Sequence, residues 1–146
     1  MQRPWHGNGP QTKIDTDRGD IIWEPIAPTD RSLDEGWLKP RKMKRKELDE
    51  VRDAFVKASE RSIEAGFEVI EIHMAHGYLL HSFLSPLSNS RNDEYGGSIE
   101  NRMRFPLEVV KKVRETIGEN VPLFVRISAE DGLDGGWTIE DLSLIH

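Results

Sequence analysis

The 146-residue sequence contains no cysteine. A disulfide framework, a thiolate zinc site and a cysteine nucleophile are therefore excluded within this segment. The sequence also lacks an apolar run near the roughly 20 residues that span a bilayer, and its first residues show no charged-then-apolar secretory signal. We therefore expect a soluble, cytoplasmic protein without a membrane partner.

The sequence also lacks a net positive charge. Its net charge is −6 and its pI is about 5.4. Nucleic acids and anionic membranes favour basic patches, so neither is an expected partner. One basic run, at residues 39–46, leads into a segment rich in Glu and Asp. We interpret this run as a solvated face rather than a binding patch.

The apolar residues that are present predict alternating helices and strands. Residues 1–43 are rich in Gly and Pro and predict a long loop region. Three- and four-residue spacing predicts helices at about 44–65 and 98–117, and β-branched runs predict strands at 67–73 and 122–128. The second helix is expected to have Ser98 as its N-cap, Gly118 as its stop and an apolar stripe of Met103, Leu107, Val110, Val113 and Ile117. Residues 74–97 between the first strand and the second helix are expected to form a loop, and residues 129–146 contain the start of a third helix at Thr138.

This order predicts an α/β fold in which parallel strands are joined by helical crossovers. Residues 44–128 form the helix-strand-helix-strand unit, which contains only one complete βαβ unit. Two parallel strands cannot bury both faces of a sheet. We therefore interpret the chain as a slice of a larger α/β protein, either a barrel or a doubly wound sheet.

Strand alternation places polar side chains on one face of the first predicted strand. Val69, Glu71 and His73 share this face, and His73 lies at the carboxyl end, where α/β folds place their active sites. His76 and Tyr78 follow in the loop above the strand end. Two imidazoles and a phenol can donate hydrogen bonds to an oxyanion and supply a proton. A structural His73 and a metal site formed by Glu71, His73 and His76 are the alternatives.

The second predicted strand places Phe124, Arg126 and Ser128 on one face. An arginine within such an apolar run is costly unless it meets an anion or an electron-rich acceptor. A salt bridge to Glu71 on the neighbouring strand is an alternative explanation for this arginine, and it is compatible with a contact between Arg126 and such an acceptor.

The loop predicted between the first strand and the second helix is dense in Asn, Asp and Gly at residues 88–97. Such a composition predicts tight turns whose side chains cap backbone groups. We interpret Arg91, Asp93, Asn101 and Arg102 as scaffold rather than chemistry. The spacing of Gly96 and Gly97 fits neither Gly-rich phosphate-binding motif.

Several motifs together resemble the old yellow enzyme family, in its bacterial NADPH dehydrogenase branch. They are RPW at 3–5, HMAHGYLLHSFLSPLSN at 73–89, Arg91, DEYGGS at 93–98, ENR at 100–102 and PLFVRIS at 122–128. The resemblance implies an FMN-binding (β/α)₈ TIM barrel, of which this chain is a partial barrel with about strands 4 and 5. It also implies that NADPH or NADH reduces the flavin, which then reduces an enone-type small molecule.

The resemblance further implies roles for individual residues. His73 and His76 would hold the carbonyl oxygen of the substrate, and Tyr78 would donate a proton to the α-carbon. Met74 and Ala75 would also contact the substrate, Arg126 would bind FMN, and no residue would bind a metal.

Departures from the family pattern set further expectations. The flavin-contacting cysteine segment of this branch and the C-terminal phosphate-binding loop are absent from the sequence. We therefore expect residues 1–146 to be the central fragment of a single FMN-binding domain, which in full length can be a homo-oligomer. A dienoyl-CoA reductase, an amine dehydrogenase and an inactive fragment are the alternatives.

Overall fold

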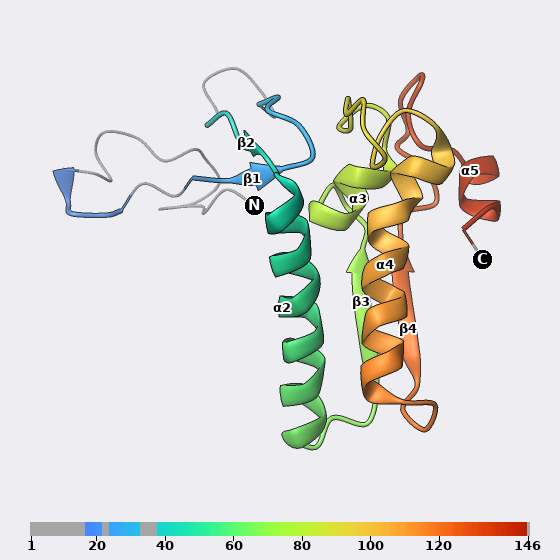
Figure 1. The fold of residues 1–146 in the computed structure, drawn as a ribbon. Helices are drawn as coiled ribbons and strands as arrows, with labels where there is room; N and C mark the ends of the chain where they lie inside the picture. The colour runs from blue at the N-terminus through green and yellow to red at the C-terminus, as the bar shows by residue number, and fades with distance from the viewer. Residues whose placement is uncertain (1–16, 22–23, 33–37, 146) are drawn as a thin grey trace.

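The computed structural model describes residues 17–21, 24–32 and 38–145. Within these ranges the chain has the predicted α/β character, with helices alternating with parallel strands (Figure 1). Two short parallel strands, β1 (Ile26–Ala27) and β2 (Arg41–Lys42), pair inside the region predicted as loop. The motif at residues 3–5 lies outside the described residues.

The main unit is the predicted helix-strand-helix-strand unit. It consists of α2 (Arg45–Glu64), β3 (Ile70–Met74), α4 (Ile99–Ile117) and β4 (Leu123–Ile127), followed by α5 (Ile139–Ser143). Ser98 Oγ accepts the N–H of Asn101 at the start of α4, and Gly118 ends this helix at φ +71°, as the sequence predicts. Thr138 likewise caps α5.

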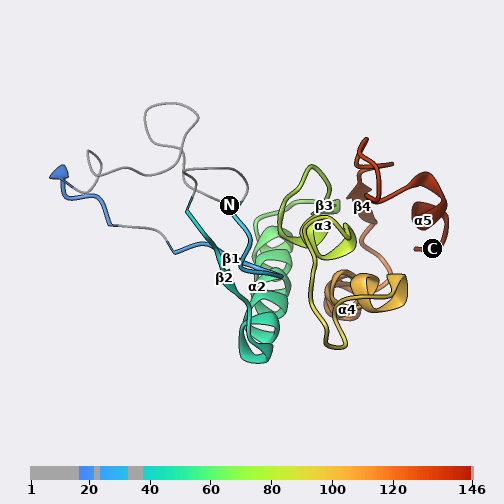
Figure 2. The same ribbon diagram turned by 90° about the horizontal axis from the view of Figure 1, so that it is seen from above.

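The parallel pairing of β3 and β4 sets their register. Ile70 lies opposite Leu123, and His73 lies opposite Arg126. The first strand was predicted at 67–73, but it begins at Ile70 because pairing starts there. Helices α2 and α4 lie on the same side of the sheet (Figure 2).

A short helix, α3 (Leu79–Leu84), lies in the segment that was predicted as a loop. Six residues are too few to show a helical repeat, and so short a helix depends on tertiary packing. Here the packing comes from Leu80, Phe83 and Leu84, which are all at most 1% exposed. Phe83 packs against Phe105 of α4, with ring centroids 4.7 Å apart and ring planes tilted by 50°.

One apolar core joins these elements. Its buried members come from α2, β3, α3, α4 and the adjoining loops: Met43, Leu48, Ile72, Met74, Leu80, Phe83, Leu84, Tyr95, Met103, Phe105, Val109, Val113 and Trp137. The predicted apolar stripe of α4 was correct for Met103 and Val113, whereas Leu107 is 38% exposed.

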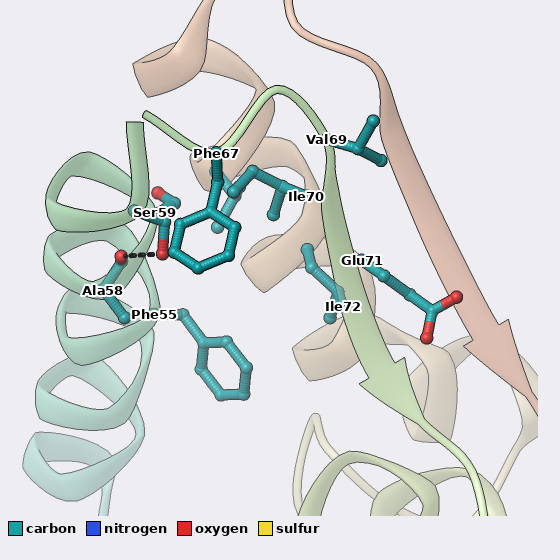
Figure 3. A pocket seen from close by; sticks show the side chains of 10 residues that line it. Phe55, Ala58, Ser59, Phe67, Val69, Ile70, Glu71 and Ile72 are labelled. Carbon is teal, nitrogen blue, oxygen red and sulfur yellow. Dashed lines mark hydrogen bonds between the residues drawn. The ribbon is translucent and has the colours of Figure 1, made fainter. Parts of the chain in front are cut away.

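Among the described residues, the opposite face of the sheet is uncovered and the outer edges of both strands are unpaired. Phe124 is 57% exposed on that face, and among the described residues β3 pairs with β4 alone. A groove of about 330 Å³ opens between α2 and β3, lined by side chains that include Phe55, Phe67 and Val69 (Figure 3). Phe67 and Val69 are 64% and 49% exposed, so apolar surface is left uncovered at this edge.

Candidate active site

The carboxyl ends of β3 and β4 bring two predicted site residues side by side. His73 and Arg126 are direct partners in the parallel register, so their side chains project from the same face. Two pairs closer to the amino ends, Glu71 lies opposite Phe124, and its Oε1 accepts the Nε–H of Arg126 at 2.8 Å. The salt bridge considered from the sequence is therefore present. Both partners are about half exposed, so the pair contributes little to stability.

Three rings gather above the end of β3. The ring centroid of His73 lies 5.2 Å from that of His76 and 5.1 Å from that of Tyr78. His73 is half-buried, whereas His76 and Tyr78 are exposed. Tyr78 is the N-cap residue of α3. The sequence predicted this convergence, and the arrangement presents two imidazoles and a phenol to one small volume.

The chain turns sharply between these rings. His76 has φ +59° and Gly77 has φ +72°, and the N–H of Tyr78 donates to the carbonyl of Ala75 at 3.2 Å. Two successive central residues with positive φ are the pattern of a type I′ turn. This turn explains how residues three apart in sequence come to the same side of the strand end.

Met74 and Ala75 lie on the other side of this segment. Their side chains are 1% and 0% exposed and pack into the core. The structure gives these two side chains a packing role, and their contact with a substrate remains a prediction.

A carboxylate that the sequence analysis did not single out organises the loop after β4. Asp131 accepts hydrogen bonds from Ser85 Oγ at 2.6 Å and from the Trp137 N–H at 2.7 Å, and its Oδ1 lies 2.8 Å from His81 Nε2. Burial raises the pKa of Asp131, but these hydrogen bonds outweigh burial and leave the pKa below its ordinary value. The carboxylate therefore fastens α3 to the loop that follows β4.

The loop at residues 88–97 is scaffold, as predicted. The Asn89 side-chain amide donates to the carbonyls of Phe83 and Tyr95, at 2.7 and 2.8 Å. Arg91 is 6% exposed and donates to Asp93 and to the carbonyls of Pro28 and Met43. These bonds satisfy buried backbone groups that would otherwise destabilise the loop.

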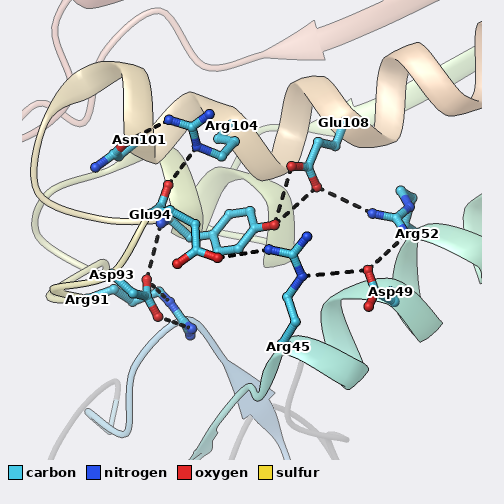
Figure 4. A network of polar contacts seen from close by, with 10 residues as sticks. Arg45, Asp49, Arg52, Arg91, Asp93, Glu94, Asn101, Arg104 and Glu108 are labelled. Carbon is cyan, nitrogen blue, oxygen red and sulfur yellow. Dashed lines mark hydrogen bonds and ion pairs between the residues drawn. The ribbon is translucent and has the colours of Figure 1, made fainter.

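Charged side chains connect this loop to both long helices (Figure 4). Arg45 of α2 donates to Glu94 at 2.9 Å, and Arg52 bridges Asp49 and Glu108. Tyr95 is 1% exposed, and its hydroxyl lies 3.3 Å from Glu108. Burial, together with this carboxylate, raises the pKa of Tyr95. This network lies among α2, the loop and α4, and it supports the loop rather than adding to the ring cluster.

The side-chain donors suit an oxyanion and an electron-rich ring better than a metal. Within the described ranges, no three His, Asp or Glu side chains are placed to hold a metal ion, so the metal-site alternative has no ligand set there. Arg126 uses only Nε in its pair with Glu71, and no hydrogen bond to its two terminal nitrogens is formed by the part of the chain that the structure describes. A half-exposed planar donor on the open face fits the acceptor edge of a flavin.

No described helix is long and apolar enough to cross a membrane.

Comparison with known proteins identifies the family. The profile of the NADH:flavin oxidoreductase / NADH oxidase family matches residues 5–145. The NADPH dehydrogenase of Clostridium acetobutylicum is 51% identical over 108 residues, which cover 74% of this chain and 32% of that protein. The chain spans about a third of the length of the NADPH dehydrogenases that it matches.

Two solved structures extend the comparison. A 2-naphthoyl-CoA reductase in complex with 2-naphthoyl-CoA is 35% identical with a TM-score of 0.79, over 84% of this chain and 19% of that one. A morphinone reductase variant in complex with tetrahydroNAD is 32% identical with a TM-score of 0.72, over 83% of this chain and 37% of that one. Since the family profile covers nearly all of the sequence, the chain belongs to the NADH:flavin oxidoreductase / NADH oxidase family.

Proposed function

We propose that this chain is part of an FMN-dependent oxidoreductase that reduces activated alkenes, such as α,β-unsaturated carbonyls, with NADPH or NADH. The observation that carries the proposal is the convergence of His73, His76 and Tyr78 above the strand pair on which His73 and Arg126 lie side by side. When bound, FMN supplies the hydride that it has taken from the nicotinamide.

The side chains of this chain supply binding, polarisation and a proton. His73 and His76 donate hydrogen bonds to the carbonyl oxygen, which gains negative charge as the alkene is reduced. This polarisation makes the β-carbon electrophilic, so that it accepts the hydride. Tyr78 then donates its phenolic proton to the α-carbon, a role that is supported by the position of its ring 5.1 Å from that of His73. Arg126 holds the flavin through its terminal nitrogens, and Glu71 orients the guanidinium.

We further propose that residues 1–146 form the central part of one (β/α)₈ barrel domain. The parallel pairing of β3 and β4, with helices on one side, is the repeating unit of such a barrel. The open edge of β3 and the apolar groove beside it suit a further parallel strand (Figure 3). The exposed face that carries Phe124 and Arg126 would then point into the barrel.

Reduction of a conjugated CoA thioester is a second candidate activity. It is favoured by the likeness to 2-naphthoyl-CoA reductase. A thioester also presents a carbonyl oxygen to the two imidazoles, so the ring cluster serves either substrate class. The two are separated by comparing rates with cyclohexenone and with a dienoyl-CoA.

The test uses a longer relative. In the Clostridium acetobutylicum NADPH dehydrogenase, the segment that matches this chain is replaced by the matching 108 residues of this chain. The chimera is expected to bind FMN and to reduce cyclohexenone with NADPH. Removing one imidazole, as in His76→Ala, should lower kcat about 10²- to 10³-fold, and Tyr78→Phe should lower it about 10²-fold or more.

The matched control is Tyr95→Phe, which removes the other phenolic hydroxyl of the chain at a position outside the ring cluster. This variant should keep its kcat within about twofold. Equal losses in Tyr78→Phe and Tyr95→Phe would contradict the assigned proton donor. A chimera that folds and binds FMN but reduces neither substrate would overturn the proposed function.

A further inference from the structure

His76 holds an unusual backbone conformation. It is the one non-glycine residue with positive φ among residues 17–21, 24–32 and 38–145. A non-glycine residue in this region is strained, and it persists where surrounding contacts favour it. Asn, Asp and His adopt positive φ more often than other non-glycine residues, but the conformation is still uncommon, and a contact from the surrounding structure favours it.

The contact comes from the end of the neighbouring strand. The backbone N–H of His76 donates to Ser128 Oγ at 3.0 Å, across 52 positions of sequence. Ser128 directly follows β4 and, by strand alternation, lies on the same face as Arg126. The hydroxyl therefore reaches the turn from the side of the sheet where the ring cluster lies.

The hydroxyl is held by a fixed backbone. The carbonyl of Ser128 accepts the indole N–H of Trp137 at 3.1 Å, and Trp137 is 1% exposed. The backbone N–H of Trp137 donates to Asp131. Because Trp137 is buried and bonded at both nitrogens, Ser128 cannot shift without disturbing the core.

The turn decides where the second imidazole lies. On a continuous strand, residues 73 and 76 would project from opposite faces. The left-handed backbone at His76 instead brings the two imidazole centroids to 5.2 Å. A different φ at this residue would carry its imidazole away from His73.

We propose that Ser128 is a positioning residue, whose hydroxyl holds His76 in the left-handed turn and so places its imidazole beside that of His73. Its consequence for catalysis rests on the proposed function, but its effect on the turn does not. Ser128, which directly follows β4, thus helps to form the oxyanion site through His76 and does not itself contact the substrate.

The first experiment measures the turn in the 146-residue chain without cofactor. By NMR-detected hydrogen exchange, the His76 amide should be protected in the wild type. The Gly77 amide, for which no hydrogen-bond partner is found in the described part of the chain, should exchange fast. In Ser128→Ala the His76 amide should exchange about tenfold faster, and Ser128→Thr, which keeps a hydroxyl, should restore protection.

Ser143→Ala is the matched control, because Ser143 Oγ donates to a carbonyl within the exposed helix α5. It should leave the His76 amide unchanged. An unprotected His76 amide in the wild type would overturn the proposal even if Ser128→Ala fails to fold. So would exchange at His76 that Ser128→Ala does not alter.

The second experiment measures the consequence in the chimera. Ser128→Ala should lower kcat and kcat/KM together by about tenfold, since the lost interaction acts on the developing oxyanion. In the His76→Ala background the same substitution should cost nothing further, because Ser128 acts through His76. An equal loss in both backgrounds would overturn the positioning role. If the chimera is inactive while the exchange results hold, the proposed function fails and the turn assignment stands.

Discussion

The carboxyl end of the sheet and its open face are built differently. At the carboxyl end, Asn89 and Arg91 are buried and each makes several hydrogen bonds, and the partly buried Asp131 accepts hydrogen bonds from Ser85 and Trp137. On the open face and the adjoining β3 edge, apolar side chains are exposed, with Phe67 at 64% and Phe124 at 57%. The loops around the candidate site therefore hold themselves in place, whereas the open face lacks a covering layer within the described residues.

This difference separates two sources of stability. Buried polar groups that lose a partner carry a large desolvation penalty, so the loops are sensitive to single substitutions. Exposed apolar groups gain little from the fold as it stands, so their substitution costs little.

The largest effect is expected at Arg91. Arg91→Ala removes hydrogen bonds to two buried carbonyls and to Asp93, and it should lower the free energy of unfolding by about 3–5 kcal/mol or prevent folding. Urea unfolding followed by circular dichroism measures the change. Arg104→Ala, at an exposed arginine of α4, is the control and should cost less than about 1 kcal/mol. Similar costs for the two variants would contradict the expected difference between a buried and an exposed arginine.

A smaller effect is expected at Asp131. Because its folded pKa lies below the ordinary value of 3.8, its contribution is present above about pH 4 and is lost as the pH falls through the folded pKa. Asp131→Asn should lower the free energy of unfolding at pH 7 by about 1–3 kcal/mol and flatten the acid dependence below pH 4. Unfolding measured across that pH range tests both. Asp134→Asn, at an exposed position of the same loop, is the control and should cost less than about 0.5 kcal/mol at pH 7.

The open face should tolerate substitution. Phe124→Thr keeps a strand-forming residue and should change the free energy of unfolding by less than about 0.5 kcal/mol. It should also reduce self-association of the 146-residue chain, as measured by analytical ultracentrifugation. For comparison, Phe105→Ala in the core should cost about 3–5 kcal/mol. A large cost at Phe124 would show that this face is already covered.

The smallest effect is expected at the ion pair on the open face. Glu71→Gln removes a pair whose side chains are 45% and 55% exposed, and it should cost at most about 0.5 kcal/mol in low salt. The difference should vanish in high salt because screening weakens exposed pairs. Urea midpoints at two salt concentrations measure this. A cost that persists in high salt would mean that the pair is shielded from solvent.

The order of α2, β3, α4 and β4, the caps at Ser98 and Gly118 and the face on which His73 projects can all be predicted from the sequence alone. These features depend on local spacing, and strand alternation needs no distant partner. The same alternation put Ser128 beside Arg126, which was the available signal for its role. Strand alternation could not predict the hydrogen bond between Ser128 and His76, because the two residues are 52 positions apart in the sequence.

Which groups come into contact over such separations depends on the fold as a whole. Helix α3 forms because Phe83 and Leu84 pack on α4, and its six residues carry too weak a periodic signal to reveal it. Asp131 joins His81 across 50 positions, and the His76 turn depends on a hydroxyl from another strand. The physical reason is that local propensity acts within a few residues, whereas burial and hydrogen bonding act between whichever surfaces the fold brings together.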